Sequence, residues 1–225
     1  MSRHYSQLYR QLRDLDPHDY HRVIRYYEEA EADIGRLDVL ENFELTAYYV
    51  DALYATGEYR QHQLMVDLVI QNSIVHNLNE VAGVSRDIYQ YMLFRKAAAA
   101  YRLRDFPVAT HVGRELIRID PTRQLYRKFL RVTLFKQQTR LLQIGRAAFI
   151  ASILCTAGLI LLNLIWIRNF LPEYVPRVNL AVAISFATGL SLLAGAYGTA
   201  YLRAHRAAYG FQQKQANKPW RKRLD

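Results

Sequence analysis

The chain has 225 residues, of which 51% are hydrophobic and 22% charged, with a formal net charge of +10 at pH 7. Its single cysteine, Cys155, excludes a disulfide framework and a cluster of thiolate metal ligands. Residues 1–121 carry 14 Lys and Arg against 18 Asp and Glu, whereas residues 122–225 carry 16 against 2, so the basic half lies beside apolar segments and argues against nucleic acid as a partner.

Residues 1–136 predict an all-α domain, since apolar residues recur at helical spacing and neither a strand pattern nor a hairpin-turn dipeptide occurs. The first ten residues have no apolar core, so we expect no secretory signal peptide. A basic helix is expected from Pro121, either separate from the first apolar segment or continuous with it. Asp16 and Pro17 should begin the second helix as cap and first-turn residue. The helices predicted before the basic helix are residues 5–15, 17–34, 39–56, 58–72, 87–103 and 106–119.

Within residues 93–121, two helices contain Ala97, Ala100, Ala109 and Gly113 at the places where helices approach closely, and an Asp105-Phe106 turn joins them. This pattern resembles a tetratricopeptide repeat, and residues 43–70 and the segment from 18 to 30 resemble it more weakly. The turn aromatics lie 39 and 47 residues apart, against the usual period of about 34, so the repeats are divergent. The bulky His62, at the position equivalent to Ala109, argues against tight pairing of the third and fourth helices.

The resemblance implies a stack of helical hairpins whose first helices line a groove for an extended peptide or a partner helix. The family's clamp for a peptide carboxylate needs Lys and Asn, and Ala47, Asp51, Phe94 and Ala98 stand there, so we expect no clamp. In the alternative interpretation, the groove aromatics only pack against neighbouring helices. The resemblance implies these groove residues: Glu44, Asp51, Tyr54, Tyr91, Phe94, Tyr101 and Arg102.

Two uncharged segments, residues 147–167 and 178–202, predict a transmembrane hairpin. The first has 21 residues, which as a helix span roughly 31 Å, close to the ~30 Å hydrocarbon core of a bilayer. Pro172 and Pro176 in the linker favour a tight turn. The predicted domains are therefore a helical domain (1–136), the basic helix with the hairpin (137–205) and an interfacial tail (206–225).

Small residues recur every four positions along the second segment, at Ala183, Ala187, Ser191, Gly195 and Thr199. Such a stripe lets helix backbones approach closely in lipid, and we expect it to face Ala151 and Cys155 within the hairpin or to form a seam between copies. Asn163 is the strongly polar residue of the first segment. We expect it to hydrogen-bond to Ser185, to Thr188 or across copies.

Lys and Arg cluster before the first segment and after the second, away from the linker. By the positive-inside rule both termini are therefore expected in the cytoplasm, and we expect a bacterial-type inner membrane. The anionic headgroups of lipids are the expected partner of these cations. The predicted headgroup contacts are Arg140, Arg146, Arg203, Arg206, Arg221, Lys222 and Arg223.

No phosphate loop, paired carboxylates or nucleophile motif occurs, and His18 and His21 share a helical face without a third metal ligand. We therefore expect no enzyme, no metal and no cofactor. The sequence favours a membrane-anchored scaffold or adaptor that binds a protein partner at the cytoplasmic face. The alternative is a homo-oligomeric hairpin that permeabilises or conducts, with the helical domain as its sensor.

Overall fold

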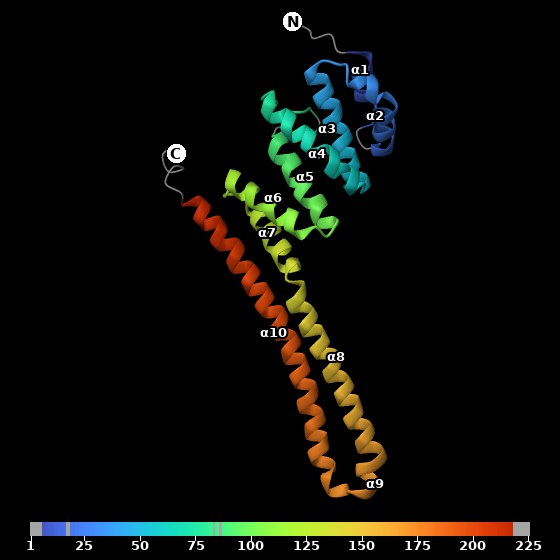
Figure 1. Cartoon of the computed structure of the whole chain (residues 1–225), viewed down its shortest axis with the longest axis vertical. Helices are drawn as coiled ribbons and strands as arrows, with labels where there is room; N and C mark the ends of the chain where they lie inside the picture. Colours follow the sequence, from blue (N-terminus) through green and yellow to red (C-terminus); the bar gives the residue numbers. More distant parts are fainter. Residues whose placement is uncertain (1–5, 17–18, 83, 86, 218–225) are drawn as a thin grey trace. The chain divides into compact units, whose positions relative to one another are not determined.

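The computed structural model describes residues 6–16, 19–82, 84–85 and 87–217, and Figure 1 shows that helices make up nearly all of this part. The predicted all-α fold is confirmed, since the described residues contain no β-strand and a single isolated bridge, between Val81 and Ser85. Two compact units divide the chain: residues 1–133 with 212–225, and residues 134–211. The helices are α1 (Gln7–Arg13), α2 (Tyr20–Ile34), α3 (Val39–Thr56), α4 (Tyr59–Val75), α5 (Ile88–Arg102), α6 (Phe106–Ile119), α7 (Gln124–Gln137), α8 (Thr139–Leu162), α9 (Arg168–Phe170) and α10 (Val175–Ala216).

Aspartates begin three helices of the first unit. Asp19, Asp87 and Asp105 each accept a hydrogen bond from the backbone N–H three residues later, at 3.2, 3.0 and 3.2 Å. Because such caps satisfy N–H groups that the helix leaves unpaired, they fix where α2, α5 and α6 start. The predicted cap at Asp16 is wrong: α2 begins after Asp19, and Pro17 lies outside the described residues.

Successive helices of the first unit pack as hairpins, in the pairs α2–α3, α3–α4, α4–α5 and α5–α6 (Figure 1). Helix α3 is the centre of its core, with Phe43, Leu45, Val50 and Leu53 fully buried. It ends at Gly57, whose φ of +91° is the left-handed conformation that closes a helix and that side-chain-bearing residues rarely adopt. The predicted bounds of this helix are confirmed.

The expected loosening at His62 is wrong. The imidazole is fully buried on α4, and its Nδ1 lies 2.9 Å from the Val50 carbonyl of α3, where it donates a hydrogen bond. The ring therefore fills the contact between α3 and α4 and bonds to the facing helix. Its Nε2 is buried without a hydrogen-bond partner among the described residues.

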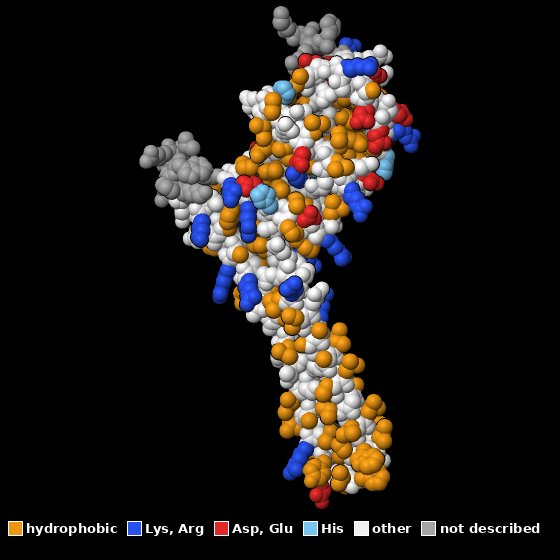
Figure 2. Space-filling view, viewed as in Figure 1, with side chains coloured by type: hydrophobic (Ala, Val, Ile, Leu, Met, Phe, Trp, Pro, Cys, Tyr) orange, Lys and Arg blue, Asp and Glu red, His pale blue; other side chains and the backbone are white. Residues whose placement is uncertain are grey.

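The second unit is a hairpin of α8 and the first part of α10, joined through α9 (Figure 1). Both arms are long and apolar enough to cross a membrane, and only 6% of the most apolar 18 residues of each is buried in the protein. A core helix of a soluble protein would be mostly buried, whereas these two arms leave most of their apolar side chains exposed. Figure 2 shows hydrophobic side chains covering the visible face of this hairpin.

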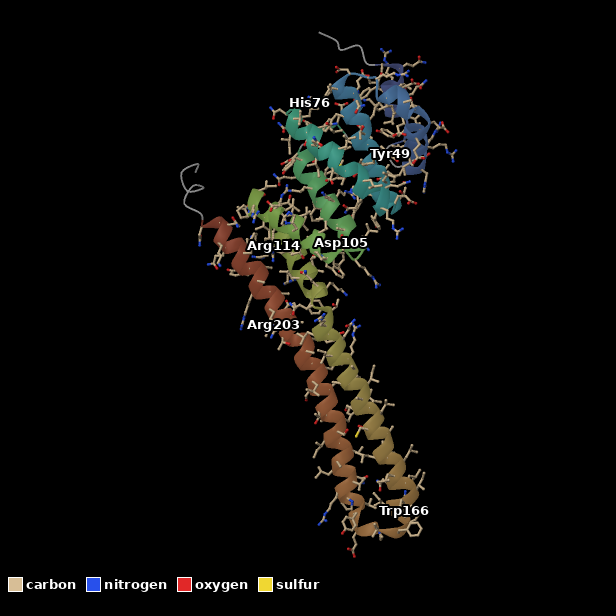
Figure 3. The ribbon with its side chains drawn as sticks, viewed as in Figure 1. Tyr49, His76, Asp105, Arg114, Trp166 and Arg203 are labelled. Atoms are coloured by element: carbon tan, nitrogen blue, oxygen red, sulfur yellow. The ribbon has the colours of Figure 1, made fainter. Side chains whose placement is uncertain are left out.

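The hairpin arms extend beyond the predicted segments. Helix α8 begins at Thr139, after a non-helical Gln138, so of the two alternatives left open by the sequence, the basic helix α7 is separate from the first arm. Helix α10 continues to Ala216, and the expected separate tail from residue 206 is therefore helical as far as it is described. Trp166 lies beside the turn between the arms (Figure 3).

The contact between the arms uses small and hydroxyl side chains. A Cβ added at Gly189 would lie 2.2 Å from Ser152 Oγ, and one added at Gly145 would lie 2.5 Å from Ala196 Cβ. At the first of these close approaches, Ser152 also donates to the Ser185 carbonyl at 2.6 Å. The arms therefore touch almost backbone to backbone, which only glycine permits at these two positions.

The predicted stripe does not form this contact. Each helical residue turns the chain by about 100°, so the predicted stripe, two positions from Ser185 and Gly189, lies on another face of α10. Ala151 and Cys155, its expected neighbours, are exposed as well. All five members of the stripe are exposed: Ala183, Ala187, Ser191, Gly195 and Thr199.

Asn163 pairs near the turn end of the hairpin. Its Nδ2 donates to Asn179 Oδ1 at 2.9 Å, so the expected bonds to Ser185 or Thr188 are wrong. Ser185 Oγ instead lies 3.1 Å from Thr156 Oγ1. Asn163 also opens a short π-helical turn, Asn163–Ile167, a local widening of the helix that is frequent at functional positions.

Candidate protein-binding surface

A groove of about 440 Å³ lies in the first unit, between α1, the start of α2, α3 and the 78–85 connection. Leu12, Leu15 and Val84 give it apolar walls, while Arg13 and Asp51 bring charge of both signs to it. Tyr48 donates a hydrogen bond to the Ala82 carbonyl, which ties the connection to α3. The groove is therefore apolar inside and charged at its edge, as surfaces that bind a peptide or helix commonly are.

Asp51 also belongs to a cluster formed by facing positions of α3 and α5. Tyr91 Oη donates to Asp51 Oδ1 at 2.6 Å, and Arg95 Nη2 lies 3.2 Å from the same oxygen. The Arg95 guanidinium carbon stands 4.2 Å from the ring centroid of Tyr54 and 5.0 Å from that of Tyr91. Two tyrosine rings thus hold an arginine in place, and about a quarter of its side chain remains exposed.

Two side chains of this cluster, Tyr91 and Arg95, have shifted pKa values. Burial, the hydrogen bond to Asp51 and the charge of that carboxylate together raise the pKa of Tyr91 to about 12, so the phenol stays protonated and donates. Burial alone would lower the pKa of Arg95, but Asp51 and Tyr91 outweigh it and raise that pKa. Near neutral pH the Arg95 guanidinium is therefore charged and the Tyr91 phenol is neutral.

Below the cluster, His62 packs edge-on against Tyr54, with ring centroids 5.4 Å apart. Burial lowers the pKa of His62, the Val50 carbonyl partly opposes this, and the charge of Arg95 lowers it further. The imidazole is therefore neutral near pH 7 and supports Tyr54 from beneath. It is a packing group of the surface rather than a part exposed to a partner.

The structure divides the predicted groove residues into three groups. Asp51, Tyr54 and Tyr91 come together as expected, with Arg95 between them. Glu44 is buried under α1, where it accepts a hydrogen bond from the Tyr9 hydroxyl. The short first helix therefore covers the place where the predicted groove would have begun.

The remaining predicted positions are not part of one open groove. Phe94 lies 5.6 Å from the Phe129 ring of α7, and Tyr101 lies 6.1 Å from it. Arg102 is exposed at the end of α5. For Phe94 and Tyr101, the alternative interpretation, packing between helices, describes the structure.

Sequence reasoning missed Arg95 and the contribution of α1. Arg95 follows Tyr91 by four residues, so the two share a helical face, and this spacing was the available signal. The place of Leu12 and Leu15 in the groove wall depends on how α1 docks, through Tyr9 on Glu44 and through the Tyr26 hydroxyl, which donates to the Leu8 carbonyl at 3.0 Å. No local pattern encodes such a contact between distant segments.

Four of the predicted headgroup cations, Arg140, Arg146, Arg203 and Arg206, are exposed on the second unit. Arg221, Lys222 and Arg223 lie outside the described residues, as does His18 of the weak histidine pair. Among residues that the structure does describe, no three His, Cys, Asp or Glu side chains gather closely enough to hold a metal ion.

Comparisons of this chain with protein families, with curated proteins and with solved structures find no match. The class of protein is therefore defined by the molecule itself. It is an all-α protein that joins packed helical hairpins to two helices long and apolar enough to span a membrane.

Proposed function

We propose that this protein is a membrane-anchored adaptor, whose tetratricopeptide-like helical unit binds a protein partner beside the cytoplasmic face of an inner membrane. The observation that carries the proposal is the Tyr54–Arg95–Tyr91 stack, held by Asp51 on two neighbouring helices and continuous, through Asp51, with the apolar groove. Tyrosine and arginine are the residue types that dominate binding energy at protein interfaces. A rigid, partly exposed stack of them lowers the entropic cost of ordering the surface on binding.

The anchoring half of the proposal rests on the hairpin. Its arms are apolar outside and close-packed inside, and the cytoplasmic orientation follows from the Lys and Arg that flank the arms away from the turn. Held in this way, the groove would meet partners confined to the same surface, where the effective concentration is high. The proposed gain is local concentration, and no catalytic step is required.

The partner that fits is a helix or extended peptide with apolar side chains for the groove and a polar edge for the Asp51–Arg95 pair. Both charges of this pair are already matched, so a strongly acidic or basic segment gains little there. Discrimination would come from shape and from aromatic contact. The unit's groove is therefore proposed as a site for a mainly apolar segment, such as an amphipathic helix.

A site-specific photo-crosslinker tests this proposal in intact cells. Placed at Tyr54, it should give one discrete adduct with a second protein, and Arg95→Ala should abolish the adduct while leaving the amount of protein in the membrane unchanged. The matched control is the same crosslinker at Arg114, an exposed position on α6, which contributes no residue to the stack (Figure 3). Equal adducts from both positions, or an adduct insensitive to Arg95→Ala, would refute the site.

An anchor exchange separates the adaptor from the rival function. If the hairpin, residues 139–211, is replaced by an unrelated two-helix anchor, an adaptor keeps its adduct at Tyr54. If the hairpin is itself the effector, the exchange removes permeabilisation or conduction, whether or not the adduct at Tyr54 remains. The hydroxyls of the exposed stripe favour the adaptor, because Ser191 and Thr199 each donate to the carbonyl four residues earlier and so need no partner in lipid.

A further inference from the structure

The hairpin has a groove on one side that the proposed adaptor function does not use. Its volume is about 530 Å³, and it lies between α8 and α10 at the end of the hairpin away from the turn. On each helix the lining residues recur at three- and four-residue intervals, so each helix presents one continuous face to the groove. The lining residues are Arg146, Phe149, Ile150, Leu190, Leu193, Ala194 and Tyr197.

The close contacts of the arms create this groove. At Gly145 with Ala196 and at Gly189 with Ser152, the backbones approach so closely that larger side chains must project to the sides. Between these two points, Phe149 of α8 and Leu193 of α10 line the groove together with the small Ala194. From Leu190 to Tyr197 the groove runs roughly 10 Å along the helix, within the ~15 Å depth of one lipid leaflet.

One end of this apolar groove carries a fixed cation. Arg146 donates from Nε and Nη2 to the Tyr197 hydroxyl, at 2.9 and 2.8 Å, which leaves three of its five N–H groups for another acceptor. No carboxylate of the described residues lies within ion-pair distance of Arg146, and Glu173 is the only acid in residues 134–211. Tyr197 is itself held against Phe135, with ring centroids 6.3 Å apart.

We infer that this groove is a binding site for one anionic phospholipid. An acyl chain lies along Phe149, Leu190 and Leu193, and the phosphate receives hydrogen bonds from the free N–H groups of Arg146. The planar guanidinium, oriented by Tyr197, matches the two oxygens of a phosphate. The combination of an apolar slot with an unpaired arginine at its headgroup end fits a lipid, since neither a soluble anion nor a neutral acyl chain uses both parts.

This inference depends on the proposed insertion of the hairpin in a membrane, and it goes beyond the general attraction between basic residues and headgroups. A diffuse attraction acts through every cation at the membrane surface and has no stoichiometry. A built site holds one lipid per chain and depends on particular residues. The distinction is measurable with the full chain in detergent micelles.

Native mass spectrometry of the purified chain, with added dioleoylphosphatidylglycerol or dioleoylphosphatidylcholine, provides the test. The wild-type chain should retain one phosphatidylglycerol in preference to phosphatidylcholine, and Arg146→Gln should lower that occupancy about tenfold. Ala194→Phe, which places a large ring among the lining residues of the groove, should remove the bound lipid while Arg146 remains. Arg203→Gln removes an exposed cation of the same hairpin that does not line the groove, and it should have no effect.

Other outcomes overturn the inference. If Arg146→Gln and Arg203→Gln lower occupancy equally, the attraction is diffuse, and if Ala194→Phe retains the lipid, the groove does not hold it. Inorganic phosphate at millimolar concentration should not displace the lipid, and displacement would identify an anion site without an acyl chain. Carbonate extraction of the same variants from membranes is the separate test of insertion, so failure of the anchor is distinguishable from failure of the site.

Discussion

Replacing Gly189 by alanine should loosen the hairpin, whereas the same replacement at Gly195 should not. The new Cβ at position 189 would lie 2.5 Å from Ser152 Cβ, against the 3.5–4.0 Å of a normal carbon contact, so the arms must separate by about 1 Å. Overpacking of this kind costs about 1–3 kcal/mol, and the better helix propensity of alanine returns up to about 1 kcal/mol. A net loss of about 1–2 kcal/mol corresponds to a roughly 5- to 30-fold rise in the open population.

Gly195 is the matched control, since it lies on the same helix and has no atom within 4 Å of an added Cβ. Alanine there gains propensity and loses nothing, so the hairpin should become slightly more stable. The assay titrates the purified protein with SDS in mixed micelles. Opening is followed by alkylation of a cysteine at the buried position Thr156 in a Cys155→Ser background. If Gly195→Ala opens the hairpin and Gly189→Ala does not, the arms meet through the stripe predicted from sequence, and the packing described above is incorrect.

Lowering the pH from 7.5 to 5.5 should weaken the α3–α4 pair. Burial lowers the native pKa of His62 below its ordinary value of 6.5, so the unfolded chain binds more protons than the folded one. The free energy of unfolding therefore falls as the pH drops through about 6.5. Hydrogen exchange of α3 and α4 peptides measures this loss, and His62→Gln should remove the pH dependence. Asn163→Leu should cost about 0.6–2 kcal/mol in the SDS titration by leaving Asn179 unpaired, and the double replacement of both asparagines should recover most of that loss. Asp105→Ala should speed hydrogen exchange in α6 by destabilising its start by about 1 kcal/mol, while Asp105→Asn should keep most of the cap.

Much of the fold was predictable because local chemistry determines it. Gly57 and the Asp105 cap end and begin helices through bonds within a few residues, so the limits of α3 and α6 can be predicted from sequence. The absence of charge over residues 147–167 and 178–202 likewise predicts two apolar arms without reference to any other part of the chain. Such features need no knowledge of which segments meet.

Contacts between distant segments were the part that sequence reasoning could not resolve. Two sets of small residues with four-residue spacing run along α10, one through Ser185 and Gly189 and one through Ala187 and Ser191, and composition does not distinguish them. The choice depends on a complementary surface on α8, where Ser152 and Gly145 supply it. The same limitation concealed the docking of α1 over Glu44, and it explains why only part of the predicted groove is open.

The candidate surface was half predicted for the same reason. Asp51 and Tyr91 were expected because each stands at a groove position of its own helix. Arg95 completes the site through a tertiary stack, and its role appears only when Tyr54 and Tyr91 are brought to either side of it. The prediction for His62 was wrong for a related reason. The side chain was judged too large for the α3–α4 contact, but its Nδ1 donates to the Val50 carbonyl of α3 at 2.9 Å, and this tertiary bond could not be read from the sequence.

The exposed stripe of α10 has a consequence for how this sequence can change. Ser191 and Thr199 donate their hydroxyl hydrogen bonds within their own helix. The stripe would therefore leave no hydroxyl unsatisfied, whether lipid tails or another helix covered it. A neighbouring helix would therefore need only a complementary shape to pack there, since the stripe holds no hydroxyl that needs a hydrogen-bond partner from that helix. New helix contacts at this stripe are thus open to variants of this chain at little cost to the hairpin itself, and one bulky side chain at Gly195 would prevent them.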